Sequence, residues 1–257
     1  MTEHPAYGQL RPVTETASVL LCDNPGLMTL DGTNTWVLRG RGSDEVVIVD
    51  PGPDDEAHIE RVAALGKVSL VLISHRHGDH TDGIDQLVDA TGAVVRSVGS
   101  GFLRGLGGIL TDGEVIDAAG LRITVLATPG HTADSVSFLL DDAVLTADTV
   151  LGRGTTVIDN EDGSLGQYLE SLRRLNGLAG RAVLPGHGPD LPDIGDATAM
   201  YLAHRQERLD QVRGALRVLG EDATARQIVE HVYTDVDEKL WDAATWSVQA
   251  QLNYLRA

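Results

Sequence analysis

Residues 68–80 of the chain read Val-Ser-Leu-Val-Leu-Ile-Ser-His-Arg-His-Gly-Asp-His, and this stretch decides the fold. Its first half is an apolar run that is typical of a buried strand. Its second half places three of the chain's nine histidines and one aspartate within six positions. No helix or strand turns four such side chains to one side, whereas a loop leaving the end of a strand does so. The stretch therefore indicates a metal-binding loop at a strand end rather than a solvated polar turn.

Three further residues of metal-ligand type follow apolar runs elsewhere in the chain. His131 lies in Thr-Pro-Gly-His-Thr, Asp148 in Thr-Ala-Asp-Thr and His187 in Leu-Pro-Gly-His-Gly. Each comes just past an expected strand, where sheets present functional groups. Considered singly, His131 could be an ordinary histidine in a turn, Asp148 could cap a loop, and His187 could belong to a linker. Together with the histidine-rich loop, they indicate one site.

Short apolar runs alternate with turns and amphipathic segments through the first 194 residues. The pattern predicts strands at 35–38, 46–49, 70–73, 94–97, 121–127, 136–140, 144–146 and 182–184. It predicts helices at 54–65, 81–90 and 164–175. Many strands with few helices between them favour two packed sheets with helices outside over one doubly wound sheet.

Proline and glycine interrupt the pattern at 186–196, and we place a domain boundary there, giving domains 1–194 and 195–257. The second domain is expected to hold three helices, the middle one opened by a capping box of Thr224 and Gln227. Such a unit is winged-helix-like in size. It carries seven Lys or Arg against ten Asp or Glu, so DNA binding is disfavoured.

The composition is that of an ordinary globular protein, with 42% hydrophobic and 23% charged residues among 257. No run approaches 18 apolar residues, so no membrane partner is expected. The N-terminus lacks the pattern of a secretory signal, and Cys22 is the sole cysteine; both favour a cytoplasmic location. The net charge of -18 would repel the backbone of a nucleic acid.

The sequences HRHGDH, TPGHT, TADT and LPGHGP, taken in this order, resemble those of the metallo-β-lactamase-fold hydrolases over residues 16–194. The resemblance implies an α/β fold, a four-layer αββα sandwich followed by a small helical, winged-helix-like region. It also implies a cofactor of two Zn²⁺ per chain, because imidazoles and a shared carboxylate suit zinc. The sequence does not by itself separate zinc from manganese or iron.

Residue by residue, the resemblance assigns the ligands of both metals. The first metal takes His75, His77 and His131; the second takes Asp79, His80 and His187; Asp148 bridges the two. Asp79 is in addition the expected catalytic residue, which orients the attacking hydroxide and passes a proton to the leaving group. Asp50, at a strand end, is expected to orient a ligand histidine.

A narrower resemblance is carried by residues 24–36, 151–157 and 201–205, which are similar to the β-lactamase-like protein 2 subfamily. It implies that 32–36 and 152–156 border the active site. The substrate contacts expected from these segments are Asn34, Arg153, Thr155 and Thr156. Arg153 is expected to meet an anionic group of the substrate.

The function indicated is that of a dinuclear zinc-dependent hydrolase, in which a metal-bridging hydroxide cleaves an ester, thioester, amide or phosphodiester bond. An endoribonuclease acting on single-stranded RNA is the alternative, because subfamily members have been associated with RNA cleavage; the acidic balance stands against it. A second alternative is a mononuclear iron persulfide dioxygenase, disfavoured by the full second ligand set. A non-catalytic binding module would lack ligands, and none is missing. A small-molecule substrate is therefore expected, no DNA partner is expected, and a homodimer is left open.

Overall fold

The computed structural model describes residues 7–234 and 241–256, and in them two mixed sheets pack face to face. The first sheet has the order β1-β2-β3-β4-β5-β6, and the second has the order β11-β10-β9-β8-β7. The first consists of β1 (Leu10–Pro12), β2 (Ala17–Leu21), β3 (Asn34–Leu38), β4 (Glu45–Val49), β5 (Lys67–Leu72) and β6 (Val94–Arg96). The second consists of β7 (Val115–Ala118), β8 (Leu121–Ala127), β9 (Val136–Leu139), β10 (Ala143–Ala147) and β11 (Ala182–Pro185).

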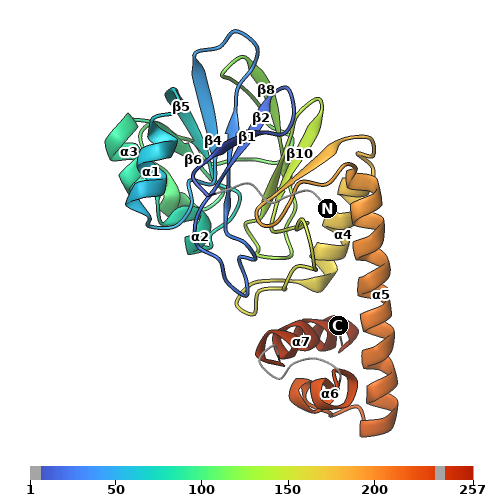
Figure 1. The fold of residues 1–257 in the computed structure, drawn as a ribbon. Coiled ribbons are helices and arrows are strands. Elements are labelled where there is room, and N and C mark those ends of the chain that lie inside the picture. Colours follow the sequence, from blue (N-terminus) through green and yellow to red (C-terminus); the bar gives the residue numbers. More distant parts are fainter. Residues whose placement is uncertain (1–6, 235–240, 257) are drawn as a thin grey trace.

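Helices cover the outer face of each sheet, as Figure 1 shows. On the first sheet lie α1 (Glu56–Ala63) and α3 (Ile84–Thr91). On the second lie α4 (Leu165–Asn176) and the first half of α5 (Ile194–Leu219). The αββα sandwich expected from the sequence is therefore confirmed.

Strand β4 shows why its sequence is apolar at nearly every position. Successive side chains of a strand point to opposite faces. Val47 and Val49 pack between the sheets in the same cluster as Phe138. Val46 and Ile48 pack outward in the cluster that includes residues of α1 and α3. Because both faces are covered, both sets of side chains are buried.

All eight strands expected from the sequence are present, as β3 to β6 and β8 to β11, and the three expected helices correspond to α1, α3 and α4. Three strands were missed, namely β1, β2 and β7. Strand β1 is three residues long and contains proline, and β7 is a half-exposed edge strand, so neither shows a clear period. The histidine-rich segment is also not wholly a loop, because 78–81 form a short helical turn, α2 (Gly78–Thr81).

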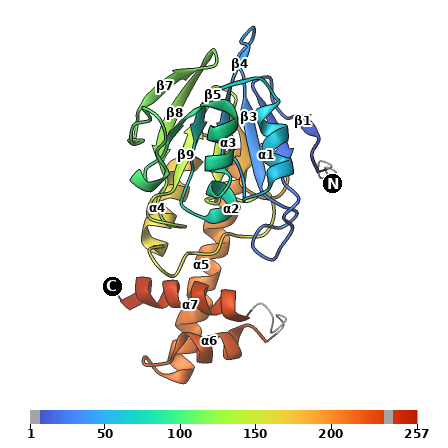
Figure 2. The ribbon, with the colours of Figure 1, turned by 90° about the vertical axis from the view of Figure 1, so that its left-hand side faces the viewer.

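The long helix α5 belongs to two hydrophobic clusters. Its first half buries Tyr201 in the cluster formed with α4. Its second half buries Val212 and Leu216 against α6 (Ala225–Val232) and α7 (Trp241–Arg256). Figures 1 and 2 show α6 and α7 gathered at the end of α5, with α7 crossing it below the sandwich. The boundary predicted at 194/195 thus coincides with the start of a helix that serves both parts.

The capping box expected at the start of α6 is present, with Thr224 and Gln227 each bonding the other's backbone nitrogen. None of the helices in the described ranges has the length and hydropathy that a membrane crossing requires.

A histidine is buried on the outer side of the first sheet. His58 of α1 is 1% exposed, and its Nε2 lies 2.8 Å from Thr35 Oγ1. Burial lowers the pKa of His58 from 6.5 to about 4. The native protein therefore holds this imidazole neutral at a pH where the unfolded chain protonates it.

The free energy of unfolding should consequently fall in mild acid. The stabilisation from His58 is complete above pH 6.5 and decreases by about 3 kcal/mol as the pH falls to about 4, because only the unfolded chain gains a proton in that window. Denaturant unfolding at several pH values would measure the loss. The difference in free energy of unfolding between wild type and H58Q should become smaller as the pH falls. If the free energy of unfolding depends on pH equally in both proteins, the prediction is wrong.

Candidate metal centre and active site

Seven side chains from four separate segments of the sequence meet at one edge of the sandwich. The loop after β5 brings His75 and His77, and α2 brings Asp79 and His80. The segments after β8, β10 and β11 bring His131, Asp148 and His187. The structure thus gathers all seven of the ligands expected from the sequence into two neighbouring groups, in each of which the ligand atoms lie within 4.8 Å of one another.

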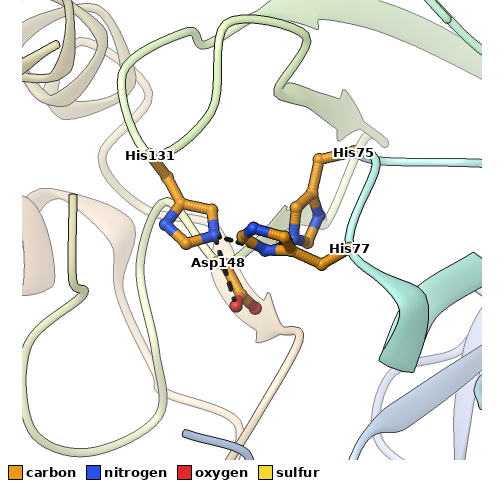
Figure 3. A group of neighbouring side chains, drawn as sticks. All are labelled: His75, His77, His131 and Asp148. Atoms are coloured by element: carbon orange, nitrogen blue, oxygen red, sulfur yellow. Dashed lines mark hydrogen bonds and ion pairs between the residues drawn. The ribbon is translucent and has the colours of Figure 1, made fainter. Parts of the chain in front are cut away.

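The first ligand group consists of His75, His77, His131 and Asp148, whose side chains converge in Figure 3. His77 Nδ1 lies 3.0 Å from His75 Nε2 and 3.1 Å from His131 Nε2. Asp148 Oδ2 lies 3.7 Å from His131 Nε2. Three imidazole nitrogens directed at one point cannot all form hydrogen bonds with one another, because a ring nitrogen carries at most one hydrogen. A cation at this point would satisfy them together.

The second ligand group consists of Asp79, His80 and His187, and the other oxygen of Asp148 faces it. His187 Nε2 lies 3.3 Å from His80 Nε2 and 3.2 Å from Asp79 Oδ2. Asp148 Oδ1 lies 3.4 Å from His187 Nε2, yet it is buried without a hydrogen-bond partner. An orphaned buried carboxylate oxygen is costly unless a cation pairs with it. The donor set therefore fits two divalent cations that share Asp148.

The second nitrogen of each ligand imidazole faces an acceptor. A hydrogen bond from this nitrogen to its acceptor fixes the orientation of the ring. The other ring nitrogen, which points into the ligand group, is then free to bind a metal. The acceptors are Ser74 Oγ for His75 (2.9 Å), Asp159 Oδ2 for His77 (2.9 Å), Asp50 Oδ2 for His80 (2.9 Å), the Val157 carbonyl for His131 (2.6 Å) and the Gly32 carbonyl for His187 (3.1 Å).

Asp50 lies where the sequence placed it, beneath the ligands. It is 2% exposed and accepts from the backbone nitrogen of Ser74 at 2.8 Å and from its hydroxyl at 2.7 Å. Because the Ser74 hydroxyl donates to Asp50, it must accept from His75. Asp50 thus orients His80 directly and His75 through Ser74. Its φ of 56° is uncommon for a residue with a side chain, and such strain gathers at functional sites.

The pKa values of the histidines differ between the two ligand groups. Burial holds the pKa of His75 well below its usual value, and burial lowers the pKa of His131 too, so both are neutral, as metal ligands must be. In the second group, burial opposes charge, but three aspartates raise the pKa of His80 to about 9. Without a cation this group would have to take up protons, so metal binding there is expected to release them.

Sequence reasoning missed Asp159, which supports the first group. Its Oδ2 accepts from His77 Nε2, and its Oδ1 lies 3.0 Å from Arg76 Nη2. Arg76 also reaches Glu161 and Asp162, at 3.3 Å each. Asp159 follows no strand and lies 82 residues from His77, so no local pattern marks it. Only the folded chain brings it to the ligand.

Close approach explains a glycine among the ligands. A Cβ on Gly186 would collide with Asp148 Oδ1 and lie 2.9 Å from His80 Cε1. The glycine of the Pro-Gly-His sequence therefore leaves room for the shared carboxylate between the two groups.

Five of the seven candidate ligands form the floor of a cavity of about 450 Å³, namely His77, Asp79, His131, Asp148 and His187. Its wall is mainly apolar, with Leu27 and Met28 at the rim and Trp246 contributed by α7. The apolar lining residues are Leu27, Met28, Leu30, Leu151, Val157 and Trp246. The cavity is thus shaped for a ligand with a large apolar portion.

The four expected substrate contacts are distributed unequally. Arg153, Thr155 and Thr156 line the cavity. Asn34 does not: it is 3% exposed, and its amide nitrogen donates to the carbonyls of Pro185 and Gly188, so it supports the segment that carries His187. The guanidinium of Arg153 forms an ion pair with Asp31, so its charge is already balanced at the cavity wall.

Comparison with known proteins identifies relatives of the whole arrangement. A family model of the Metallo-beta-lactamase superfamily matches residues 28–187, and one of the Beta-lactamase associated winged helix domain matches residues 224–257. A beta-lactamase-like protein 2 homolog of Caenorhabditis elegans is 28% identical over 249 residues, which cover 90% of this chain and 82% of the relative. The atrochrysone carboxyl ACP thioesterase of Aspergillus fumigatus is 31% identical over 242 residues, which cover 83% of this chain and 72% of the relative. The resemblance expected from the sequence is confirmed.

The fold has a counterpart among solved structures. The crystal structure of a beta-lactamase domain protein from Burkholderia ambifaria matches with a TM-score of 0.83 and 23% identity. The match covers 99% of this chain and 90% of that one, so the C-terminal helices are included in the shared fold.

Substitution of Asp159 by Asn should weaken the first metal site. The neutral amide holds His77 less firmly, and loss of such a support typically lowers metal affinity about 10- to 100-fold. Competition with a chromophoric zinc chelator would measure the affinity. The matched control is D162N, which removes a charge beside Arg76 but touches no ligand imidazole. Equal affinities of D159N and wild type would show that Asp159 does not support the site.

Proposed function

Because the chain belongs to the metallo-β-lactamase superfamily, we propose that it is a dinuclear zinc-dependent hydrolase whose substrate is a small acyl thioester. The observation that carries the proposal is the shared carboxylate of Asp148, placed between two groups of ligands at the floor of an apolar cavity. The five imidazoles and two carboxylates would hold the metals, and nitrogen and oxygen donors of this kind suit zinc.

The leaving group favours a thioester among the candidate bonds. Burial raises the pKa of the Asp79 carboxyl, but His80 and His187 outweigh burial and hold it at about 2. Asp79 is therefore ionised at neutral pH and can accept a hydrogen bond from the attacking water. A proton taken from that water is the one that Asp79 can pass to the leaving group. An amine must receive such a proton to leave an amide, whereas a thiol of pKa about 8.5 leaves as a thiolate, so a thioester makes the smaller demand on this site.

The residues of the cavity would have separate roles in thioester hydrolysis. When bound, the two divalent cations supply a hydroxide near neutral pH and polarise the carbonyl oxygen of the substrate. Asp79 accepts a hydrogen bond from the attacking water and orients it toward the carbonyl carbon. The apolar wall holds the acyl group and excludes other water. Hydrolysis breaks the C–S bond and yields a carboxylate and a thiol.

The cavity wall and the relatives support this substrate class. One relative of 31% identity is named a thioesterase, and an apolar wall suits an acyl group. RNA would require a basic groove or stacked aromatic side chains. The guanidinium that lines the cavity is paired with Asp31, and the chain carries a net charge of -18. A mononuclear iron site would leave the second ligand group without a role.

Thioester hydrolysis should depend on both ligand groups. Protein loaded with zinc should release thiol from octanoyl-coenzyme A, and H75A and H187A should each lower kcat/KM by more than about a hundredfold, beyond the effect of losing a supporting contact. A thiol-reactive dye would follow the reaction. The control is H231A, which removes an exposed histidine of α6. Two zinc ions per chain are expected by elemental analysis; one iron per chain, or cleavage of RNA but not thioesters, would refute the proposal.

The acyl group should contact Trp246 at the cavity wall. W246A should raise KM for octanoyl thioesters about tenfold through lost apolar contact, and leave KM for acetyl thioesters nearly unchanged. The control is Y254A, on the same helix and equally exposed but outside the cavity. A similar change in KM for both chain lengths would remove Trp246 from the acyl site.

A further inference from the structure

A second cavity, of about 250 Å³, lies beside the first, between α5 and α7. Residues 155–157 line both cavities, so this segment lies between them. The far wall carries His204, Arg205 and Arg208 from α5, and Gln251 from α7. Among residues 7–234 and 241–256, none of those that line it is acidic.

The charge of this second cavity is opposite to that of the protein. The chain carries a net charge of -18, yet two guanidinium groups and an imidazole meet here. Within residues 7–234 and 241–256, neither Arg205 nor Arg208 forms an ion pair with a carboxylate, whereas Arg76, Arg96 and Arg104 do. Arg205 is only 3% exposed. A buried cation without a counter-charge is costly, which points to an anionic ligand.

Buried hydrogen-bonding atoms in this wall also lack partners. Arg205 Nε, His204 Nδ1 and Gln251 Oε1 are buried and make no hydrogen bond to any residue that the structure describes. Arg208 Nε donates to His204 Nε2 at 3.4 Å, so the hydrogen of a neutral His204 sits on Nδ1. Arg205 Nε and His204 Nδ1 are therefore two donors without an acceptor. Burial and the two neighbouring guanidinium groups lower the pKa of His204, as a positive local potential requires.

The remaining contacts hold both guanidinium groups in place. Arg205 lies over the ring of Tyr168, with 5.0 Å from Cζ to the ring centroid, and donates to the Thr156 carbonyl. Arg208 lies over the ring of Tyr233 at 4.9 Å and donates to Gln211. Side chains fixed in this way are preorganised, so little conformational entropy is lost when an anion binds.

We propose that the cavity between α5 and α7 binds a phosphate ester, and that this group is carried by the thiol half of the thioester substrate. The inference rests on the proposed function, and it specifies the leaving group. Acyl groups are carried on coenzyme A, whose arm joins the thiol to phosphate groups. The thioester would lie in the first cavity and the phosphate in the second, on the other side of residues 155–157.

The separating segment also couples the two cavities. Thr156 Oγ1 donates to the backbone carbonyl of Asp148 at 2.7 Å, and the Thr156 carbonyl accepts from Arg205. Arg205 is therefore joined through two hydrogen bonds, both made by Thr156, to the backbone of Asp148, whose carboxylate faces both ligand groups.

Two thioesters with the same acyl group test the proposal. Octanoyl-coenzyme A carries phosphates, whereas octanoyl-N-acetylcysteamine carries none. Wild type should show a kcat/KM at least about tenfold higher for the coenzyme A ester, and R208Q should lose this preference without change toward the short ester, because a charged hydrogen bond to phosphate is lost. R208K should retain part of it. The control R213Q removes an exposed charge of α5 that pairs with Asp210.

Calorimetric titration of the full chain with coenzyme A and with inorganic phosphate separates this inference from the proposed function. Coenzyme A should bind wild type and R213Q, and bind R208Q at least about tenfold more weakly. If these affinities hold but no thioester is hydrolysed, the anion site stands and the proposed function fails. If phosphate binds but wild type shows no preference between the esters, the assignment to the leaving group is wrong. If neither titrant binds, the site itself is refuted.

Discussion

The carboxylate of Asp148 imposes the constraint on which the rest of the structure depends. Its two oxygens face two separate groups of imidazoles. One of these oxygens, Oδ1, is buried and has no hydrogen-bond partner among the described residues. To surround this carboxylate, the ends of β5, β8, β10 and β11 must meet at one edge of the sandwich. Two sheets packed face to face provide that meeting, because strands from both then end beside the same space.

The ligands are positioned by acceptors drawn from distant parts of the chain. Asp50 holds His80 and Ser74, while Asp159 holds His77 from a loop 82 residues away. The rings of His77 and His80 are thus held in one orientation, each with its other nitrogen directed at a ligand group. The positive φ of Asp50 shows that backbone strain is tolerated where it places a ligand.

The C-terminal helices contribute to the cavity beside the candidate metal ligands. Through α5 they place Arg205 against the Thr156 carbonyl, and through α7 they place Trp246 at the cavity that holds the ligands. A region matched by a winged-helix family model here lines two cavities, one apolar and one basic.

The sequence by itself determined the candidate ligand residues and the strands that carry them. A short run of apolar residues that is followed by histidine or aspartate is a local pattern. It can be recognised from neighbouring residues in the sequence, without knowledge of the fold. Only the tertiary structure decided the parts that depend on packing between segments. It brought Asp159 to His77, turned Asn34 away from the cavity, paired Arg153 with Asp31, and gathered Arg205, Arg208 and His204 at one cavity between α5 and α7. No pattern along the chain encodes these contacts, because each joins side chains whose neighbours in sequence lie elsewhere.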